Sequence, residues 1–306
     1  MPSPGRETPN RLPMQRFNVA LISAVTILGM AFALAPMRGL FLGAVRPRLT
    51  SQARIDGLGS LSGPATRVLW SADMESNGNP GPDLGQWYSP DCCAHNGGGL
   101  FSSGLATAGP SFDYNHTPGG EYSAMLRIAT PSTPTSGARL FRWLEPQTYP
   151  DLYYRAWYYF PQLYTPNGNP AWWQVFQWKS KGKMEGNNPV YGLNISVATY
   201  QGQPAMSFYL CPSSRKCVSQ APPVASIPYG NSQWTRIDAH YVCAADDSGH
   251  VTIWQDGKQL FDLSGATRYR DGDCQWSVSN YSNGLSPSPS AIYVDDVAIC
   301  LGGLCP

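Results

Sequence analysis

Polar and cationic side chains interrupt an aromatic strand at residues 172–181, WWQVFQWKSK. Successive side chains of a β-strand point to opposite faces, which places Trp173, Gln177 and Lys179 together on one face. The other face, which includes Phe176, is expected in the core. An ammonium beside an amide binds a carboxylate, and an aromatic ring covers the C–H face of a sugar. The pattern predicts a face for a sugar that carries a carboxylate; the alternative is that the lysines cover a solvated strand end.

The composition of the whole chain favours strands joined by many turns. Among 306 residues, 13% are charged and 12% aromatic, and there are 31 glycines and 28 prolines. This balance fits short strands better than helices, and no segment shows a sustained helical period or an internal repeat. A net charge of +1 does not favour a nucleic-acid partner, which normally needs a strongly basic face. We expect one all-β antiparallel sandwich and a monomer.

Alternating and aromatic runs mark the strands that must position the polar face. The run 152–160 is aromatic on both faces and ends at Pro161, as expected of a central strand of a sandwich. Residues 250–254 lead into Asp256-Gly257, a pair that favours the positive φ angles of a tight hairpin turn. The other expected strands are 66–70, 122–128, 138–143, 190–200, 206–210, 234–242 and 291–299.

The first 35 residues have the pattern of a targeting segment. Three arginines precede the apolar run 17–35, which is close to the roughly 20 residues that cross a bilayer. Ala33-Leu34-Ala35 resembles a small-x-small cleavage site, but the proline that follows favours an uncleaved membrane anchor instead. Residues 1–35 are therefore predicted as a signal peptide or membrane anchor, 36–65 as a linker and 66–306 as the folded domain. We expect a secreted or surface-held extracellular protein.

Eight cysteines follow this segment, and disulfides are their natural interpretation in an exported protein. Cys211 and Cys217, and likewise Cys300 and Cys305, bracket short segments that each pair can close. The adjacent Cys92 and Cys93 are expected to bond elsewhere, with Cys243 and Cys274 as their partners. A zinc site is the alternative, although the sequence contains no C-x-x-C pair and only four histidines.

The order of the strands and their motifs resembles the heparin-lyase-like polysaccharide lyases over roughly residues 66–300. The motifs that carry this resemblance are D-M-E at 73–75, F-P at 160–161, Q-W-K at 177–179, W-T-R-I-D-A-H at 234–240, G-H-V-T-I-W-Q-D-G at 249–257 and Y-V-D-D-V at 293–297. The resemblance implies a concanavalin-A-like jelly roll, a two-sheet antiparallel sandwich with a carbohydrate groove. The G-x-V-x-I-W-x-D-G hairpin is its most distinctive part and marks the fold more than the chemistry.

The resemblance also implies roles for individual residues. Gln177 matches the family glutamine that helps neutralise the uronate carboxylate, and Lys179 stands where the family has histidine. Tyr281 looks like the later tyrosine that serves as acid or base. Arg142 looks like the arginine that contacts the acidic sugar, and Arg139 is nearly as good a match.

A lyase of this class breaks a glycosidic bond next to a uronic acid by β-elimination. The site must neutralise the carboxylate, remove the C5 proton and protonate the leaving oxygen. Lys179 can act as the base if burial and nearby cations lower its pKa, with Gln177 and Arg142 on the carboxylate and Tyr281 as the acid. Alternatively, Tyr281 carries out both proton steps and Lys179 only neutralises charge.

Further residues are candidates for substrate or metal binding. His240 is predicted either in the groove, as a replacement for the absent histidine, or on the solvated side of its sheet. Tyr191 is predicted to line the cleft, although tyrosines in sandwiches are mostly packing residues. No cofactor is expected for catalysis. Carboxylates on the opening and closing segments are candidate ligands of a structural Ca²⁺, or else turn and edge-strand residues: Asp73, Glu75, Asp295 and Asp296.

Other functions are compatible with a jelly roll. A glycoside hydrolase needs two carboxylates facing each other across a groove, and the sequence has no E-x-D-x-x-E or similar strand motif. A non-catalytic carbohydrate-binding module would keep Trp173, Gln177 and Lys179 as a sugar platform, and a protein-interaction role of the laminin-G type is also open. Lyase and binding module differ in whether a product with a new double bond appears. The expected partner in both cases is an acidic polysaccharide.

Overall fold

The described part of the chain is a set of antiparallel strands. The computed structural model describes residues 65–75, 84, 87, 97–129, 135–182, 186–210, 219–220 and 223–306, without the side chains of 182, 186–199, 209–210 and 219–220. All of them lie in one compact unit, Ser60–Pro306. The predicted leader and nearly all of the predicted linker lie outside the described residues. Within the described ranges, no helix has the length and hydrophobicity to span a membrane.

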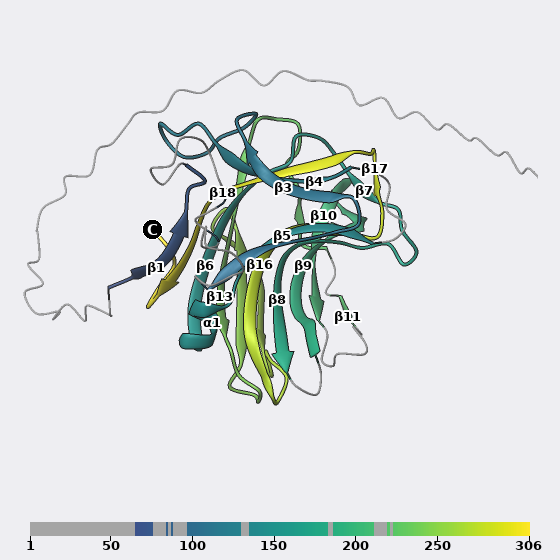
Figure 1. Cartoon of the computed structure of the whole chain (residues 1–306). Helices are drawn as coiled ribbons and strands as arrows, with labels where there is room; N and C mark the ends of the chain where they lie inside the picture. Colours follow the sequence, from purple (N-terminus) through teal and green to yellow (C-terminus); the bar gives the residue numbers. More distant parts are fainter. Residues whose placement is uncertain are drawn as a thin grey trace, which may run out of the picture. The chain divides into compact units, whose positions relative to one another are not determined.

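The first sheet has eight strands, all paired antiparallel (Figure 1). Its order is β15 (Lys258–Ser264), β14 (His250–Gln255), β13 (Trp234–Val242), β6 (Asp151–Tyr159), β18 (Ser290–Leu301), β4 (Ser123–Ile128) and β3 (Ala106–Ser111). Strand β1 (Arg67–Ala72) also pairs with β18, so the opening and closing segments are neighbours.

The second sheet also has eight antiparallel strands (Figure 1). Its order is β11 (Ser219–Gln220), β10 (Gln203–Leu210), β9 (Gly186–Tyr200), β8 (Trp173–Gly182), β16 (Gly272–Ser282), β5 (Ser136–Arg142) and β2 (Gly98–Ser103). Strand β12 (Ala225–Ser226) pairs with β10, and β7 (Thr165–Pro166) pairs with β17 (Leu285–Ser286) in a small separate sheet. A five-residue helix, α1 (Leu144–Thr148), follows β5.

Aromatic side chains from both sheets form the core between them. In β6, every second side chain from Leu152 to Tyr158 is buried, as the period of a strand requires. Trp178 of the second sheet stacks on Tyr241 of the first, with ring centroids 4.3 Å apart. The Tyr158 hydroxyl crosses the same interface and donates a 2.6 Å hydrogen bond to the Val175 carbonyl. The predicted all-β antiparallel sandwich is therefore confirmed.

Strand β8 is irregular near its start, and this changes which face its side chains occupy. Its pairing with β9 shifts register between Gln174 and Phe176, and its pairing with β16 shifts between Val278 and Tyr281. An inserted residue reverses the alternation on one side of a bulge. Trp173 is consequently 1% exposed and belongs to the core, with its indole nitrogen donating to Asn280. The prediction of Trp173 as a sugar platform is wrong.

The disulfides agree only in part with the expected pairing. Cys300–Cys305 closes the short C-terminal loop as predicted. Cys243 bonds to Cys274, so the prediction that these two pair with Cys92 and Cys93 is wrong. The Cys243–Cys274 bond links the segment after β13 in the first sheet to β16 in the second, a proximity that only the stacking of the two sheets creates. The other four cysteines lie outside the described residues.

Candidate active site

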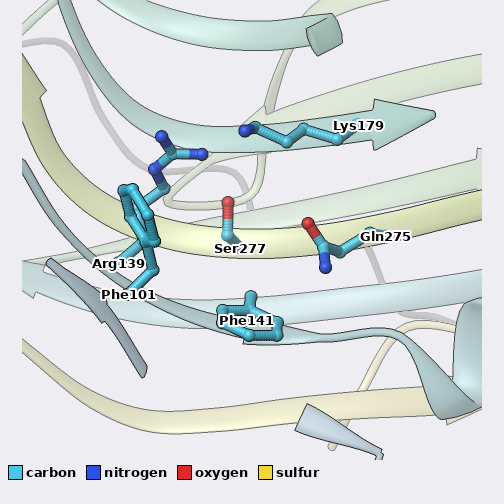
Figure 2. Close-up of a pocket in the computed structure, with 6 residues that line it drawn as sticks. All are labelled: Phe101, Arg139, Phe141, Lys179, Gln275 and Ser277. Carbon is cyan, nitrogen blue, oxygen red and sulfur yellow. The ribbon is translucent and has the colours of Figure 1, made fainter. Parts of the chain in front are cut away.

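One face of the second sheet gathers polar and aromatic side chains from four adjacent strands. Lys179 of β8 is paired in register with Gln275 of β16, and Ser277 of β16 with Phe141 of β5. Arg139 of β5 completes this set beside Phe101 of β2. These six side chains line a pocket of about 130 Å³ (Figure 2).

Lys179 is the half-buried cation of this pocket. Its side chain runs along the sheet and directs Nζ towards the Arg139 guanidinium (Figure 2). Burial, together with the positive charge of Arg139, lowers the pKa of Lys179 to about 7. A substantial fraction of Lys179 is therefore the neutral amine at neutral pH, and a neutral amine can accept a proton.

The Arg139 guanidinium is oriented by hydrogen bonds that run through the side-chain amides of two glutamines. One guanidinium nitrogen donates to Gln177 Oε1 at 3.4 Å, and Gln177 Nε2 donates to Gln174 Oε1 at 2.6 Å. Gln177 is 1% exposed and does not itself line the pocket. Burial lowers the pKa of Arg139, and the interaction with Tyr281 opposes that shift. A guanidinium remains charged under such conditions, so Arg139 stays a fixed cation.

Tyr281 lies on the other side of Arg139 from the pocket lysine. The Arg139 guanidinium carbon lies 4.3 Å from the centroid of the Tyr281 ring and 4.9 Å from that of Phe101. The Trp172 ring meets Tyr281 edge to face at 5.0 Å. Of the predicted catalytic residues, Gln177, Lys179 and Tyr281 are thus brought together around Arg139.

Arg142 does not belong to this site, so its predicted contact with the sugar is wrong. Within β5, Arg139 and Phe141 point to the pocket face, and Arg142 points to the opposite face with Leu140. Its guanidinium pairs with both carboxylate oxygens of Glu145, at 3.0 and 2.5 Å, and is 2% exposed. The sequence-based alternative, Arg139, is the arginine of the site.

His240 lies on the first sheet and not on the pocket face of the second. Its Nε2 is 2.7 Å from Asp151 Oδ1, and its ring stacks on Tyr153 with centroids 4.3 Å apart. His240 is partly exposed on the solvated side of the first sheet, which is the second of the two places predicted for it. His240 is therefore not a replacement for the absent groove histidine. Tyr191 lies in β9, where its backbone pairs with that of Trp178 in β8. The side chain of Tyr191 lies outside the described part of the structure.

The four candidate calcium ligands accept hydrogen bonds from protein groups; Asp73 Oδ1 accepts one from the backbone N–H of Glu75 at 3.2 Å. Glu75 Oε1 accepts hydrogen bonds from Asn115 Nδ2 and from the backbone N–H groups of residues 121 and 122. Asp295 accepts from the backbone of residues 116, 117 and 296, and Asp296 binds His116 Nδ1 at 2.5 Å. No group of three or more His, Cys, Asp or Glu side chains in the described ranges is arranged to hold a metal. The calcium site at these carboxylates stays a prediction.

A comparison with protein families identifies the chain by a match over the strands described above. The family model described as polysaccharide lyase matches residues 145–298, which is half of the chain. The chain belongs to the polysaccharide lyase family. This lyase-family chain has no significant match among curated protein sequences.

Solved structures similar to this lyase-family chain have low sequence identity to it. The endo-β-1,4-glucuronan lyase from the fungus Trichoderma reesei is 15% identical, with a TM-score of 0.54, and the match covers 78% of this chain and 96% of that one. An alginate lyase from a Chlorella virus is 11% identical with a TM-score of 0.43, over 67% and 93% of the two chains. The first of these likenesses shows a common fold.

Sequence reasoning missed several residues of the candidate site. Gln174 was placed on the core side of β8 because the bulge leaves no signature in the sequence. Phe101 in β2 and Phe141 in β5 come near Lys179 of β8 only because the order of strands in the sheet is β8, β16, β5, β2. The sequence of each strand does not reveal this order. In β16, polar residues alternate with apolar or aromatic ones from Gln275 onward. This alternation could have placed Gln275 and Ser277 on the same face as Tyr281.

Proposed function

We propose that this chain cleaves uronate-containing polysaccharides by β-elimination at the Arg139–Lys179 pocket. The observation that carries the proposal is that Arg139 and Lys179 are two neighbouring basic side chains whose described partners are one amide, two aromatic rings and each other, with no carboxylate. Buried charges in proteins are normally paired because desolvation is costly. Two cations left in this state favour an anionic ligand, and a uronate carboxylate supplies the anion.

The roles of the residues follow from their charges and positions. Arg139, oriented by Gln177, binds the substrate carboxylate and so makes the neighbouring C5 proton more acidic. The neutral Lys179 amine removes that proton, the C5–H electron pair becomes the C4–C5 double bond, and the C4–O bond breaks. Tyr281 donates its phenolic proton to the leaving oxygen. In the second arrangement, Tyr281 performs both proton steps while Lys179 stays protonated and binds the carboxylate with Arg139.

The test is the appearance of unsaturated chain ends, measured by the ultraviolet absorbance of the new double bond, on a panel of uronate polysaccharides. We expect activity on at least one polymer, a loss of at least about 10³-fold in kcat for Tyr281→Phe, and a similar loss for Lys179→Ala if lysine is the base. Lys258→Ala, at an exposed position of β15, is the matched control and should retain activity.

Two results contradict the proposal. If no polymer yields unsaturated ends although the same polymers are retained in a pull-down, the chain is a carbohydrate-binding module. If folded Tyr281→Phe and Lys179→Ala variants both keep the full rate, the reaction takes place elsewhere.

We further infer that the sandwich is a concanavalin-A-like jelly roll and that the chain is exported. Support for export comes from the disulfides Cys243–Cys274 and Cys300–Cys305, because such bonds persist in oxidising compartments. Expression with the native N-terminus, followed by fractionation and N-terminal sequencing, distinguishes a cleaved signal from an anchor. Recovery of the full chain in the cytosol with reduced cysteines would contradict export.

A further inference from the structure

Gly137 and Tyr281 face each other across the ladder between β5 and β16. A Cβ atom built on Gly137 would lie 1.9 Å from Tyr281 Cδ2, 2.7 Å from Cγ and 2.8 Å from Cβ. Those three are the nearest atoms to it, so the tyrosine occupies the volume that any other residue at 137 would need. The tyrosine therefore lies directly against the glycine backbone.

Space, and not backbone conformation, is what requires glycine at this position. The φ angle of Gly137 lies outside the left-handed region, so an L-residue could adopt the same backbone. Glycine inside a strand weakens it through entropy and lost packing, and often marks a close approach of another group. At Gly137 the approaching group is the ring of a candidate catalytic residue.

The ring of Tyr281 is held by two other contacts. The Arg139 guanidinium lies 4.3 Å from its centroid, and Trp172 meets it edge to face at 5.0 Å. Arg139 and Gly137 are two residues apart on β5 and thus share one face of the strand. Contact with Gly137 fixes the distance between the Tyr281 ring and β5, and this distance places the phenol beside Arg139.

We propose that Gly137 is a positioning residue that fixes the Tyr281 phenol for proton transfer; this rests on the function proposed above. An alanine methyl would overlap the root of the ring, at Cβ and Cγ, and not a flexible end. The ring must then turn about χ1 into another rotamer, which carries the phenol oxygen away from its place. A misplacement of about 1 Å at a reacting group can cost about 10²-fold in rate.

The experiment compares Gly137→Ala with Gly109→Ala in β3, where a Cβ meets nothing within 4 Å. Both changes replace glycine by alanine inside a strand, so both share the same backbone effects. For Gly137→Ala we expect kcat to fall about 100-fold with KM changed less than about threefold, and for Gly109→Ala kcat within about twofold of wild type. In a Tyr281→Phe background, adding Gly137→Ala should change the residual rate by less than about twofold, because both act through one group.

A second measurement does not depend on activity. The three distances place the Cβ direction of Gly137 at the Cδ2 edge of the Tyr281 ring and close to the ring plane, so the ring current should shift the Gly137 Hα on that side downfield. We expect this shift for Gly137 in the wild type and in Tyr281→Phe, and its loss in Tyr281→Leu. This measurement needs no variant at position 137, so it tests the geometry even if Gly137→Ala fails to fold.

The outcomes separate the two proposals. A folded Gly137→Ala enzyme with wild-type kcat, or a wild-type Gly137 without the downfield shift, overturns the positioning role while Tyr281→Phe can still be inactive. Full activity of Tyr281→Phe overturns both the catalytic role of Tyr281 and the positioning role, whatever the spectrum shows.

Discussion

The two sheets of this sandwich carry cations on their faces in different electrostatic states. On or beside the first sheet, four cationic or imidazole groups have carboxylate partners within 2.5 to 2.8 Å: His116–Asp296, Arg236–Asp238, His240–Asp151 and His250–Asp262. On the second sheet, the partners described for Arg139 and Lys179 are an amide, two aromatic rings and each other's charge. A compensated face is structural, whereas an uncompensated one attracts an anion.

Of the changes that test this difference between the sheets, replacing Arg139 should have the largest effect on activity. Replacing it by glutamine removes the fixed cation and leaves the amide chain from Gln177 to Gln174 without its guanidinium. We expect kcat/KM on a uronate polymer to fall about 10³-fold, since a buried charge-assisted contact is lost at the reacting end. Steady-state kinetics with folding checked by circular dichroism measure this. Arg236→Gln on the first sheet is the control, and an equal loss in both variants would contradict the contrast.

The pH profile sharpens the comparison at Lys179. If its neutral amine is the base, the rate is proportional to the unprotonated fraction and falls about tenfold per pH unit below a pKa of about 7. We therefore expect kcat/KM at pH 5 to be about 100-fold lower than its plateau. A flat profile between pH 5 and 8 would show that the Lys179 amine is not the base.

The protonated Lys179 side chain should destabilise the folded protein, whereas a cation paired with a carboxylate stabilises it. Its pKa is lower in the folded protein than its ordinary value of 10.5, so the unfolded chain binds the proton more tightly. The resulting destabilisation is complete below about pH 7 and disappears as the pH approaches 10.5. Lys179→Met should raise the free energy of unfolding by on the order of 2 kcal/mol at pH 6 and by little at pH 10. Urea unfolding at both pH values tests this, and a variant less stable at pH 6 would refute it.

Phe101 is expected to have a moderate effect on substrate binding. It is 44% exposed at the edge of the pocket, next to Arg139, where an aromatic face can cover a sugar ring. Phe101→Ala should raise KM about fivefold and leave kcat within about twofold, because the ring contacts the substrate equally in the ground state and in the transition state. Phe112→Ala is the matched control, at a ring that is 76% exposed and outside the pocket. A fall in kcat without a change in KM would argue against a binding role.

His240 should have the smallest effect on activity. It is paired with Asp151 on the first sheet, so His240→Ala removes a surface pair and leaves the Arg139–Lys179 pocket unchanged. We expect kcat/KM within about twofold of wild type and a loss of stability of about 1 kcal/mol or less. Kinetics and thermal unfolding of this one variant check both values. A loss of activity above tenfold would mean that the first sheet takes part in catalysis.

Sequence reasoning succeeded where a strand period or a short motif was enough. The all-β sandwich, the aromatic central strand and the placement of Lys179 and Gln177 on one face follow from local alternation. It failed at Trp173 because a bulge reversed the phase of β8, and at Arg142 because the phase of β5 favours Arg139. For His240 it left two places open, the groove and the solvated side of its sheet, and the structure decides for the solvated side because β13 belongs to the first sheet.

The sequence by itself determined which residue types stand next to one another along each strand, because the alternation of a β-strand is a local property. It therefore identified Gln177 and Lys179 as a pair, whereas Tyr281 was named only through the resemblance to the lyases. Only the tertiary structure decided that Arg139 lies between Lys179 and Tyr281 and that Gly137 makes room for the tyrosine ring. Strand order, bulges and sheet stacking create those neighbours, and they depend on contacts between residues far apart in the chain.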